Sequence, residues 1–219
     1  MGREFGVFVY LPLSLGARKR GATGMRDIQP HDKLEFFKPK PADPRVVERW
    51  KARLEVLSNS EGYVLHTTLA LTNTKIFYVS EVRESVKTFL AHLLPSFVVK
   101  LEGDFQKSGF LFPHAHLLLP VLPEVRPFLV AMKLSGAKVV QPKYRSEDLP
   151  DPFSLLPADQ GPTNLLEYLT TIPDLTPLES LVNFRESTIT TLKSTPDLAR
   201  YLAKSTYTGG LRPVMEHNV

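Results

Sequence analysis

The run Phe-Pro-His-Ala-His-Leu-Leu-Leu at residues 112–119 constrains this chain more than any other stretch. In a β-strand, residues two apart point to the same face, so the run predicts a strand with His114 and His116 on one face. Ala115 and Leu117 would point the other way, into a core. Two neutral imidazoles side by side suit a divalent metal ion. Because a His-x-His pattern also arises by chance, an ordinary strand with two exposed polar residues is the alternative.

Composition limits the kinds of site that the chain can build. The 219 residues suffice for one sizeable domain, and 42% apolar with 23% charged residues is typical of a globular protein. The absence of cysteine excludes disulfides, thiolate zinc sites and a cysteine nucleophile, so a metal must be bound by His, Asp, Glu or Gln. The formal net charge of +4 and the pI of about 9.2 permit a polyanionic partner without requiring one.

The sequence also indicates where the protein works. No apolar run approaches the ~18 residues of a membrane span. The N-terminal Met1-Gly2-Arg3-Glu4-Phe5 lacks the pattern of a signal peptide, because an acidic residue interrupts it. We therefore expect a cytoplasmic protein with no membrane partner.

A predicted hairpin places a carboxylate beside the two histidines. Strand-forming residues precede and follow a turn at residues 107–109. If the turn is centred on its middle residue, antiparallel pairing sets Glu102 opposite His114, with Cβ atoms roughly 5 Å apart. A slip of one residue would move Glu102 to the other face, and a shift of two would put Asp104 in its place. The predicted metal ligands are therefore Glu102, His114 and His116.

Hydrophobic periodicity predicts the remaining elements. Strands are expected at residues 5–11, 64–73 and 137–141. Capping and proline signals, with apolar residues at helical spacing, predict helices that begin at Asp43-Pro44, Ser80, Glu124, Leu165, Thr176 and Thr195. The expected fold class is α/β in the broad sense (α+β), with a central antiparallel sheet of about five strands and helices packed on it. A single domain would span residues 1–219, with a proline-rich insertion around residues 146–177.

The last predicted helix gathers three reactive side chains. Asp197 and Tyr201 are four residues apart, and Tyr201 and Lys204 are three apart, so the members of each pair are neighbours on the helix surface. Each residue also has an ordinary explanation. An acid near a helix N-terminus is favoured by the helix dipole, and the other two could be a half-buried aromatic and a solvated charge.

In this order, the segments resemble the HUH endonuclease superfamily, and most closely the rolling-circle replication initiators of small bacterial plasmids. Thr68-Leu69-Ala70-Leu71-Thr72 resembles their first motif, and Leu101-Glu102 with the His-Ala-His strand resembles the second. Asp197-xxx-Tyr201-xx-Lys204 resembles the third, although relatives often have Glu at the position of Asp197.

The resemblance implies a metal-dependent, site-specific DNA endonuclease and strand transferase. Glu102, His114 and His116 would bind Mn²⁺ or Mg²⁺. Tyr201 would form a covalent 5′-phosphotyrosine link and leave a 3′-OH primer, while Lys204 positions the phosphate and Asp197 assists a closing hydrolytic step. The implied partner is single-stranded DNA at a plasmid origin. A homodimer and contacts with host helicase and polymerase are compatible with this role.

Further basic residues are candidates for contacts with DNA phosphates, namely Arg200, Lys193, Lys143 and Arg145. Three other interpretations stay open. The chain could be an HUH transposase or relaxase with the same chemistry, a metal hydrolase in which Tyr201 is incidental, or a non-catalytic DNA-binding protein that has the fold alone.

Overall fold

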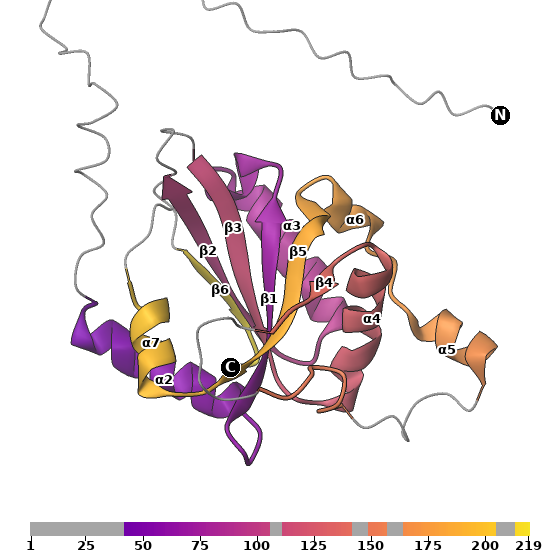
Figure 1. The fold of residues 1–219 in the computed structure, drawn as a ribbon. Coiled ribbons are helices and arrows are strands. Elements are labelled where there is room, and N and C mark those ends of the chain that lie inside the picture. Colours follow the sequence, from indigo (N-terminus) through magenta and orange to yellow (C-terminus); the bar gives the residue numbers. More distant parts are fainter. Residues whose placement is uncertain (1–41, 106–110, 142–148, 157–163, 205–212) are drawn as a thin grey trace, which may run out of the picture.

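The computed structural model of the chain describes residues 42–105, 111–141, 149–156, 164–204 and 213–219. Its centre is a six-stranded sheet in the order β4-β5-β1-β3-β2-β6 (Figure 1). All neighbouring strands are antiparallel except β4 and β5, which are parallel. The strands are β1 (Tyr63–Leu71), β2 (Phe97–Phe105), β3 (Leu111–Leu119), β4 (Lys138–Val139), β5 (Val182–Lys193) and β6 (Val214–His217).

Helices cover both faces of the sheet. One face carries α3 (Ser80–Leu93), α4 (Arg126–Leu134) and the short α6 (Thr176–Glu179), whose buried residues share one core with the strands. The other face carries α2 (Pro44–Leu57) and α7 (Pro196–Leu202), which lie together beside the sheet in Figure 1. The helix α5 (Leu165–Thr171) buries no residue, and two 3₁₀ turns, η1 (Thr74–Phe77) and η2 (Pro123–Val125), complete the described elements.

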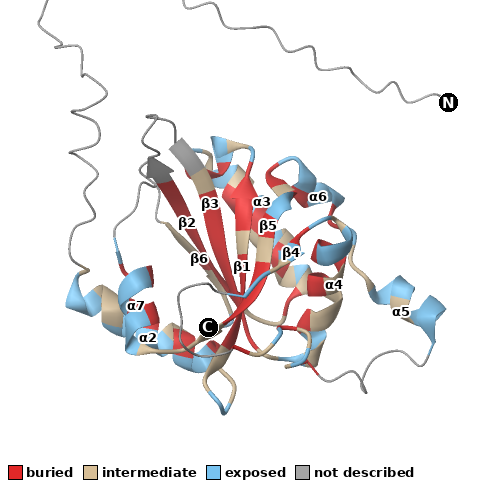
Figure 2. Ribbon diagram, in the orientation of Figure 1, coloured by how far each residue is buried: buried red, intermediate tan, exposed pale blue. Residues whose placement is uncertain are grey.

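Successive side chains of a strand point to opposite faces, so the two faces of this sheet carry different sets of residues. Leu65, Leu101 and Leu117 belong to the core under α3 and α4, as the alternation of β1, β2 and β3 requires. The alternate residues of the same strands point to the other face. There, Val98 of β2 and Leu118 of β3 pack against α2 and α7. Figure 2 shows the central strands mostly buried, the edge strands β4 and β6 less so, and the outer surfaces of the helices exposed. The second face is therefore apolar where α2 and α7 cover it and carries polar side chains further along the same strands.

Most predicted element starts are confirmed. The Asp43 carboxylate accepts a hydrogen bond of 2.8 Å from the Arg45 N–H and caps α2, with Pro44 in the first turn. The Thr195 hydroxyl accepts a hydrogen bond of 3.2 Å from the Leu198 N–H and caps α7. The helix predicted at Thr176 is only four residues long, and its N-cap is Leu175, which makes no side-chain cap.

The predicted fold class, a central sheet of about five strands with helices packed on it, is confirmed. The sheet has six strands, however, and it is mixed, because β4 runs parallel to β5. The sequence reasoning missed β5 and β6, and β4 covers only two residues of the predicted strand at 137–141. The strand predicted at residues 5–11 lies outside the described residues.

Candidate metal centre

The predicted hairpin brings the three candidate ligands together. β2 and β3 pair so that Glu102 lies opposite His114, the register expected from the turn, while Lys100 lies opposite His116. The ligand atoms of Glu102, His114 and His116 all lie within 4.8 Å of one another, and the three residues are buried. Glu102 Oε2 is 3.4 Å from Nε2 of each histidine. The strand that carries the histidines is central, between β1 and β2.

This arrangement fits a bound divalent cation. Ligand atoms that share one ion at about 2.1 Å lie roughly 3–3.5 Å from each other, which is the spacing of the carboxylate and the two rings. His116 Nε2 is buried and has no hydrogen-bond partner among the described residues, although it faces the carboxylate. A buried nitrogen without a partner is unfavourable unless something else binds it. One carboxylate and two imidazoles form a donor set that suits a divalent metal.

The carboxylate of Glu102 is held in its charged form. Burial alone would raise its pKa, but the His114 and His116 rings and the Lys100 ammonium outweigh burial and hold the pKa of Glu102 well below its ordinary value. The Lys100 ammonium contacts Glu102 Oε1 directly, and Lys100 is only 2% exposed. The centre therefore presents an ionised carboxylate at neutral pH, with one oxygen toward a lysine and the other toward the two imidazoles.

A third histidine supports the centre from β1. His66 Nε2 lies 2.9 Å from His116 Nδ1, and the two rings stack with centroids 5.1 Å apart. Burial, and then the proximity of His116, lower the pKa of His66 well below its ordinary value, so His66 is neutral. If His116 binds a metal through Nε2, its Nδ1 carries the proton and donates it to His66 Nε2. Hydrogen bonds of this kind fix the orientation of a ligating imidazole.

The helix α7 places Tyr201 at the rim of this cluster. Leu198, Ala199 and Leu202 are buried against α2 and the sheet, which fixes the side of α7 that faces inward. The Tyr201 ring remains 45% exposed, yet its centroid is 6.0 Å from that of His116. Lys204 Nζ lies 5.3 Å from the Tyr201 ring centroid. The Tyr201 ring thus lies beside the buried cluster, although α7 is remote from the hairpin in the sequence, and the Lys204 ammonium lies beside that ring.

The predicted helix included Lys204, but α7 ends at Leu202 with Ala203 as its C-cap, so Lys204 lies just beyond the helix. Asp197 is on α7, but its carboxylate pairs with Arg200 at 2.9 Å on the surface, and both side chains are mostly exposed. The structure therefore brings the Tyr201 ring to the cluster, sets the Lys204 ammonium beside that ring, and leaves Asp197 in solvent.

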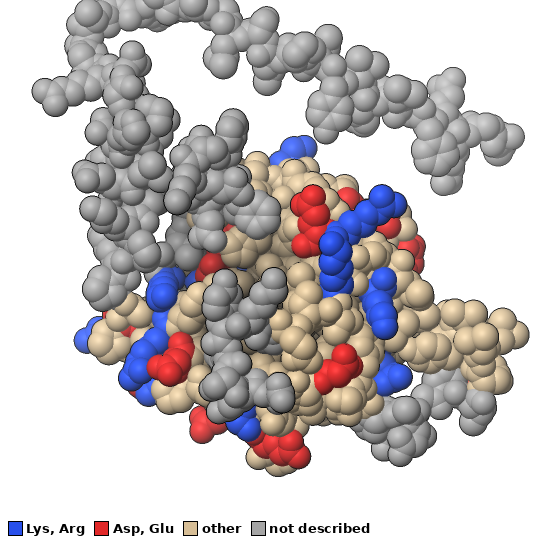
Figure 3. All heavy atoms as spheres, in the orientation of Figure 1, with Lys and Arg blue, Asp and Glu red and all other residues tan. Residues whose placement is uncertain are grey.

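Of the four predicted DNA contacts, the structure describes Lys193 and Arg200. The Lys193 ammonium lies 4.2 Å from the Tyr63 ring centroid and donates to the Glu61 carbonyl. Arg200 is exposed and paired with Asp197, while Lys143 and Arg145 lie outside the described residues. On the face drawn in Figure 3, basic and acidic side chains of the described residues are interspersed and form no single basic patch.

Sequence reasoning missed two residues of the site, His66 and Lys100. Strand alternation was the one signal available for them. His66 is two residues before Thr68 in the first motif, and Lys100 is two before Glu102, so each shares a sheet face with the predicted site. Neither was assigned a role, because alternation gives the face of a side chain but not its neighbours on adjacent strands.

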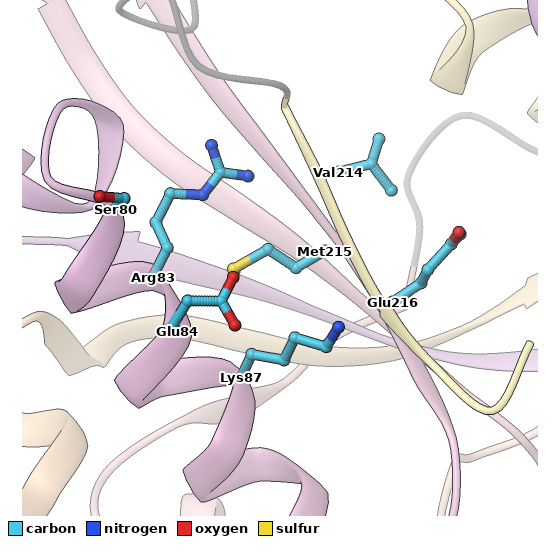
Figure 4. Close-up of a pocket in the computed structure, with 7 residues that line it drawn as sticks. All are labelled: Ser80, Arg83, Glu84, Lys87, Val214, Met215 and Glu216. Carbon is cyan, nitrogen blue, oxygen red and sulfur yellow. The ribbon is translucent and has the colours of Figure 1, made fainter.

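A separate hollow of about 350 Å³ lies at the β6 edge of the sheet and contains none of the predicted site residues. Arg83 and Lys87 extend from α3 toward β6, with Glu84 between them (Figure 4). Glu216 also lines the hollow, and its carboxylate is bound by Arg53 of α2 at 2.5 Å. The hollow is thus lined by both cations and carboxylates, and none of its residues belongs to the metal centre.

Within the described residues, no helix is long and apolar enough to cross a bilayer. No family model, no curated protein and no solved structure matches the chain.

Proposed function

We propose that this chain nicks single-stranded DNA through a covalent 5′-phosphotyrosine at Tyr201, in the manner of a rolling-circle replication initiator. The observation that supports the proposal is the contact between Tyr201 and His116, with ring centroids 6.0 Å apart. This contact brings Tyr201 of the third motif, on α7, beside His116 of the second motif, on β3, although the two elements are distant in the sequence. An exposed phenol beside a candidate metal centre is the pair of groups that such chemistry requires.

Phosphodiesters are unreactive because their anionic oxygens repel nucleophiles. A divalent ion bound by Glu102, His114 and His116 would neutralise that charge and polarise the phosphate. The ionised state of Glu102 makes the donor set ready for such an ion at neutral pH.

The nucleophile is the Tyr201 oxygen. It forms a bond to phosphorus while the bond from phosphorus to the 3′ oxygen of the preceding nucleotide breaks. The phenol loses one proton and the departing 3′ oxygen gains one, so the products are a 5′-phosphotyrosine and a free 3′-OH. Since free tyrosine has a pKa of about 10, its oxygen needs help to ionise. The Lys204 ammonium, close to the ring, favours the phenolate and attracts the scissile phosphate.

The same geometry supports the proposal of a single-stranded substrate. The ligands are buried while Tyr201 is half exposed, so a strand reaches the centre by passing over the tyrosine. A single strand can bend its backbone into such a site, and its bases are free to stack on aromatic side chains. Arg200, on the exposed side of α7, would contact the flanking phosphates.

Tyr201→Phe tests the proposal, with Tyr168→Phe on the peripheral α5 as the matched control. The first change removes one hydroxyl from an exposed ring, so folding and DNA binding should persist. Covalent attachment to DNA should vanish and nicking should fall by several orders of magnitude, while the control keeps both. Cleavage that continues without an adduct would indicate a metal hydrolase, and binding with neither would indicate a DNA-binding protein. Either result would overturn the proposal.

A further inference from the structure

We propose that Lys100 is a positioning residue that weakens metal binding at Glu102 and ties the centre to the helix that carries Tyr201. The inference rests on the metal centre of the proposed function and assigns a role to a residue outside the three motifs. Lys100 is among the largest fully buried side chains of the chain, at 2% exposure. A buried lysine is rare unless it is paired, so its partners indicate why it is there.

The first partner of Lys100 is a predicted metal ligand. Its ammonium donates to Glu102 Oε1, while Glu102 Oε2 faces the two imidazoles. One carboxylate oxygen therefore binds the lysine, and the other remains to bind an ion. The lysine supplies the positive charge that a buried carboxylate needs when no metal is present.

The same contact opposes metal binding. A dication and an ammonium that share one carboxylate repel each other strongly in a buried site. The ammonium also occupies Oε1, so Glu102 can offer the ion only a single oxygen. Lys100 should therefore lower the affinity of the centre and keep the ion readily exchangeable, with coordination positions left for a phosphate.

The second partner belongs to the end of α7. Lys100 Nζ is 3.3 Å from the carbonyl oxygen of Lys204, directly after the last turn of the helix. Carbonyls at a helix C-terminus have few partners and carry partial negative charge, so they attract a cation. Through this contact, one side chain joins the ligand Glu102 to the segment that follows Tyr201. Removal of Lys100 should loosen that end of α7 while the metal ligands on β2 and β3 stay in place.

Lys100→Met and Lys100→Gln separate these effects, with exposed Lys138→Met on β4 as control. Both changes remove the charge, and the glutamine keeps a hydrogen-bond donor. Mn²⁺ affinity would be measured by electron paramagnetic resonance of the free ion, and the end of α7 by hydrogen exchange of the Leu202 and Ala203 amides. We expect both variants to bind Mn²⁺ at least tenfold more tightly than the wild type. The metal-free methionine variant should melt at a lower temperature and exchange those amides faster. The control should match the wild type.

Mn²⁺ affinity that falls or stays unchanged in both Lys100 variants would overturn the inference. That result would mean that Lys100 does not lower the affinity of the centre and has a structural role alone. If the methionine variant does not fold, the glutamine variant gives the same answer. Tighter Mn²⁺ binding without any DNA adduct in the wild type would support the role of Lys100 and overturn the proposed nicking activity. A wild type that binds no Mn²⁺ would overturn both.

Discussion

At the residue scale, the centre is a set of charges that stabilise one another in a buried position. Glu102 is ionised because two imidazoles and the Lys100 ammonium surround it, although burial by itself opposes the charge. Each charge in the cluster therefore offsets the cost of burying the others. Single substitutions here should act through the charge that they leave behind, as well as through the contact that they remove.

Glu102→Gln keeps the shape of the side chain and leaves the Lys100 ammonium buried without its carboxylate. Loss of one partner from a buried pair costs about 3–5 kcal/mol, so we expect a decrease of that order in the free energy of unfolding of the metal-free protein near neutral pH. Because the pKa of Glu102 is lowered in the folded state, this stabilisation is fully present above its ordinary value of 4.5 and is lost as the pH falls further. Urea denaturation of both proteins across this range measures the difference, and a gap that widens in acid would contradict the assignment.

His114→Ala removes one ligand of the candidate centre. We expect Mn²⁺ affinity to fall by at least about 100-fold and DNA cleavage to be lost with it. The exposed His92 on α3 offers a matched control, and His92→Ala should leave both properties unchanged. Titration calorimetry with Mn²⁺ is the measurement, and wild-type affinity in the His114 variant would exclude the three-residue centre.

Asp197→Asn addresses the acid of the third motif. The ion pair with Arg200 is exposed, so its loss should hardly change the melting temperature. If Asp197 assists the closing hydrolysis, initial nicking persists while release of the covalent adduct slows. Time courses of adduct formation and release measure the two steps separately. An unchanged release rate would leave Asp197 with no role beyond the helix end.

At the scale of elements, the β2–β3 hairpin was predictable, and β5, on the far side of β1, was not. The turn predicted at residues 107–109 and the alternation on either side were enough to align Glu102 with His114, because a hairpin is a local structure. β5 has three consecutive buried threonine and isoleucine positions between Ile189 and Thr191, and both of its sheet faces are covered. Without a clean polar and apolar alternation, and after a helix signal at Thr176-Pro177, its strand pattern was missed.

Residues whose roles depend on neighbouring strands were also beyond sequence reasoning. His66 acts through the pairing of β1 with β3, and Lys100 through the end of α7. Both contacts are long-range, and a single sequence gives the face of each side chain without the identity of the side chain opposite. The site residues that were predicted lie within one hairpin and one helix, where spacing is sufficient.

Docking of α7 should control catalysis separately from metal binding. Leu202 is 1% exposed and packs with α2 residues, so Leu202→Ala should lower the free energy of unfolding by about 2–5 kcal/mol. Tyr201 would lose its fixed position, and adduct formation should fall, while Mn²⁺ affinity is retained because the ligands lie on strands. Val56→Ala, at a 60% exposed site on α2, is the control and should change stability by less than about 0.5 kcal/mol. Loss of metal binding in the Leu202 variant would contradict this separation.

At the scale of the whole molecule, the sheet divides structural and chemical tasks between its faces. The face under α3 and α4 is an apolar core. The other face packs on α2 and α7 at one end and holds the charged cluster further along β2 and β3. Residues that range from His66 in β1 to Lys204 after α7 thus converge on one side of a sheet whose other side supplies much of the buried apolar surface.

The most direct test of this account is to identify the residue that becomes linked to DNA. The full chain would be incubated with a library of single-stranded oligonucleotides and Mn²⁺, digested with a protease, and mapped by mass spectrometry for peptides that carry a nucleotide. The account predicts a single linked peptide that contains Tyr201, and no linked peptide when a chelator replaces Mn²⁺. Linkage at another tyrosine, such as Tyr207 or Tyr168, or cleaved DNA with no linked peptide, would contradict it.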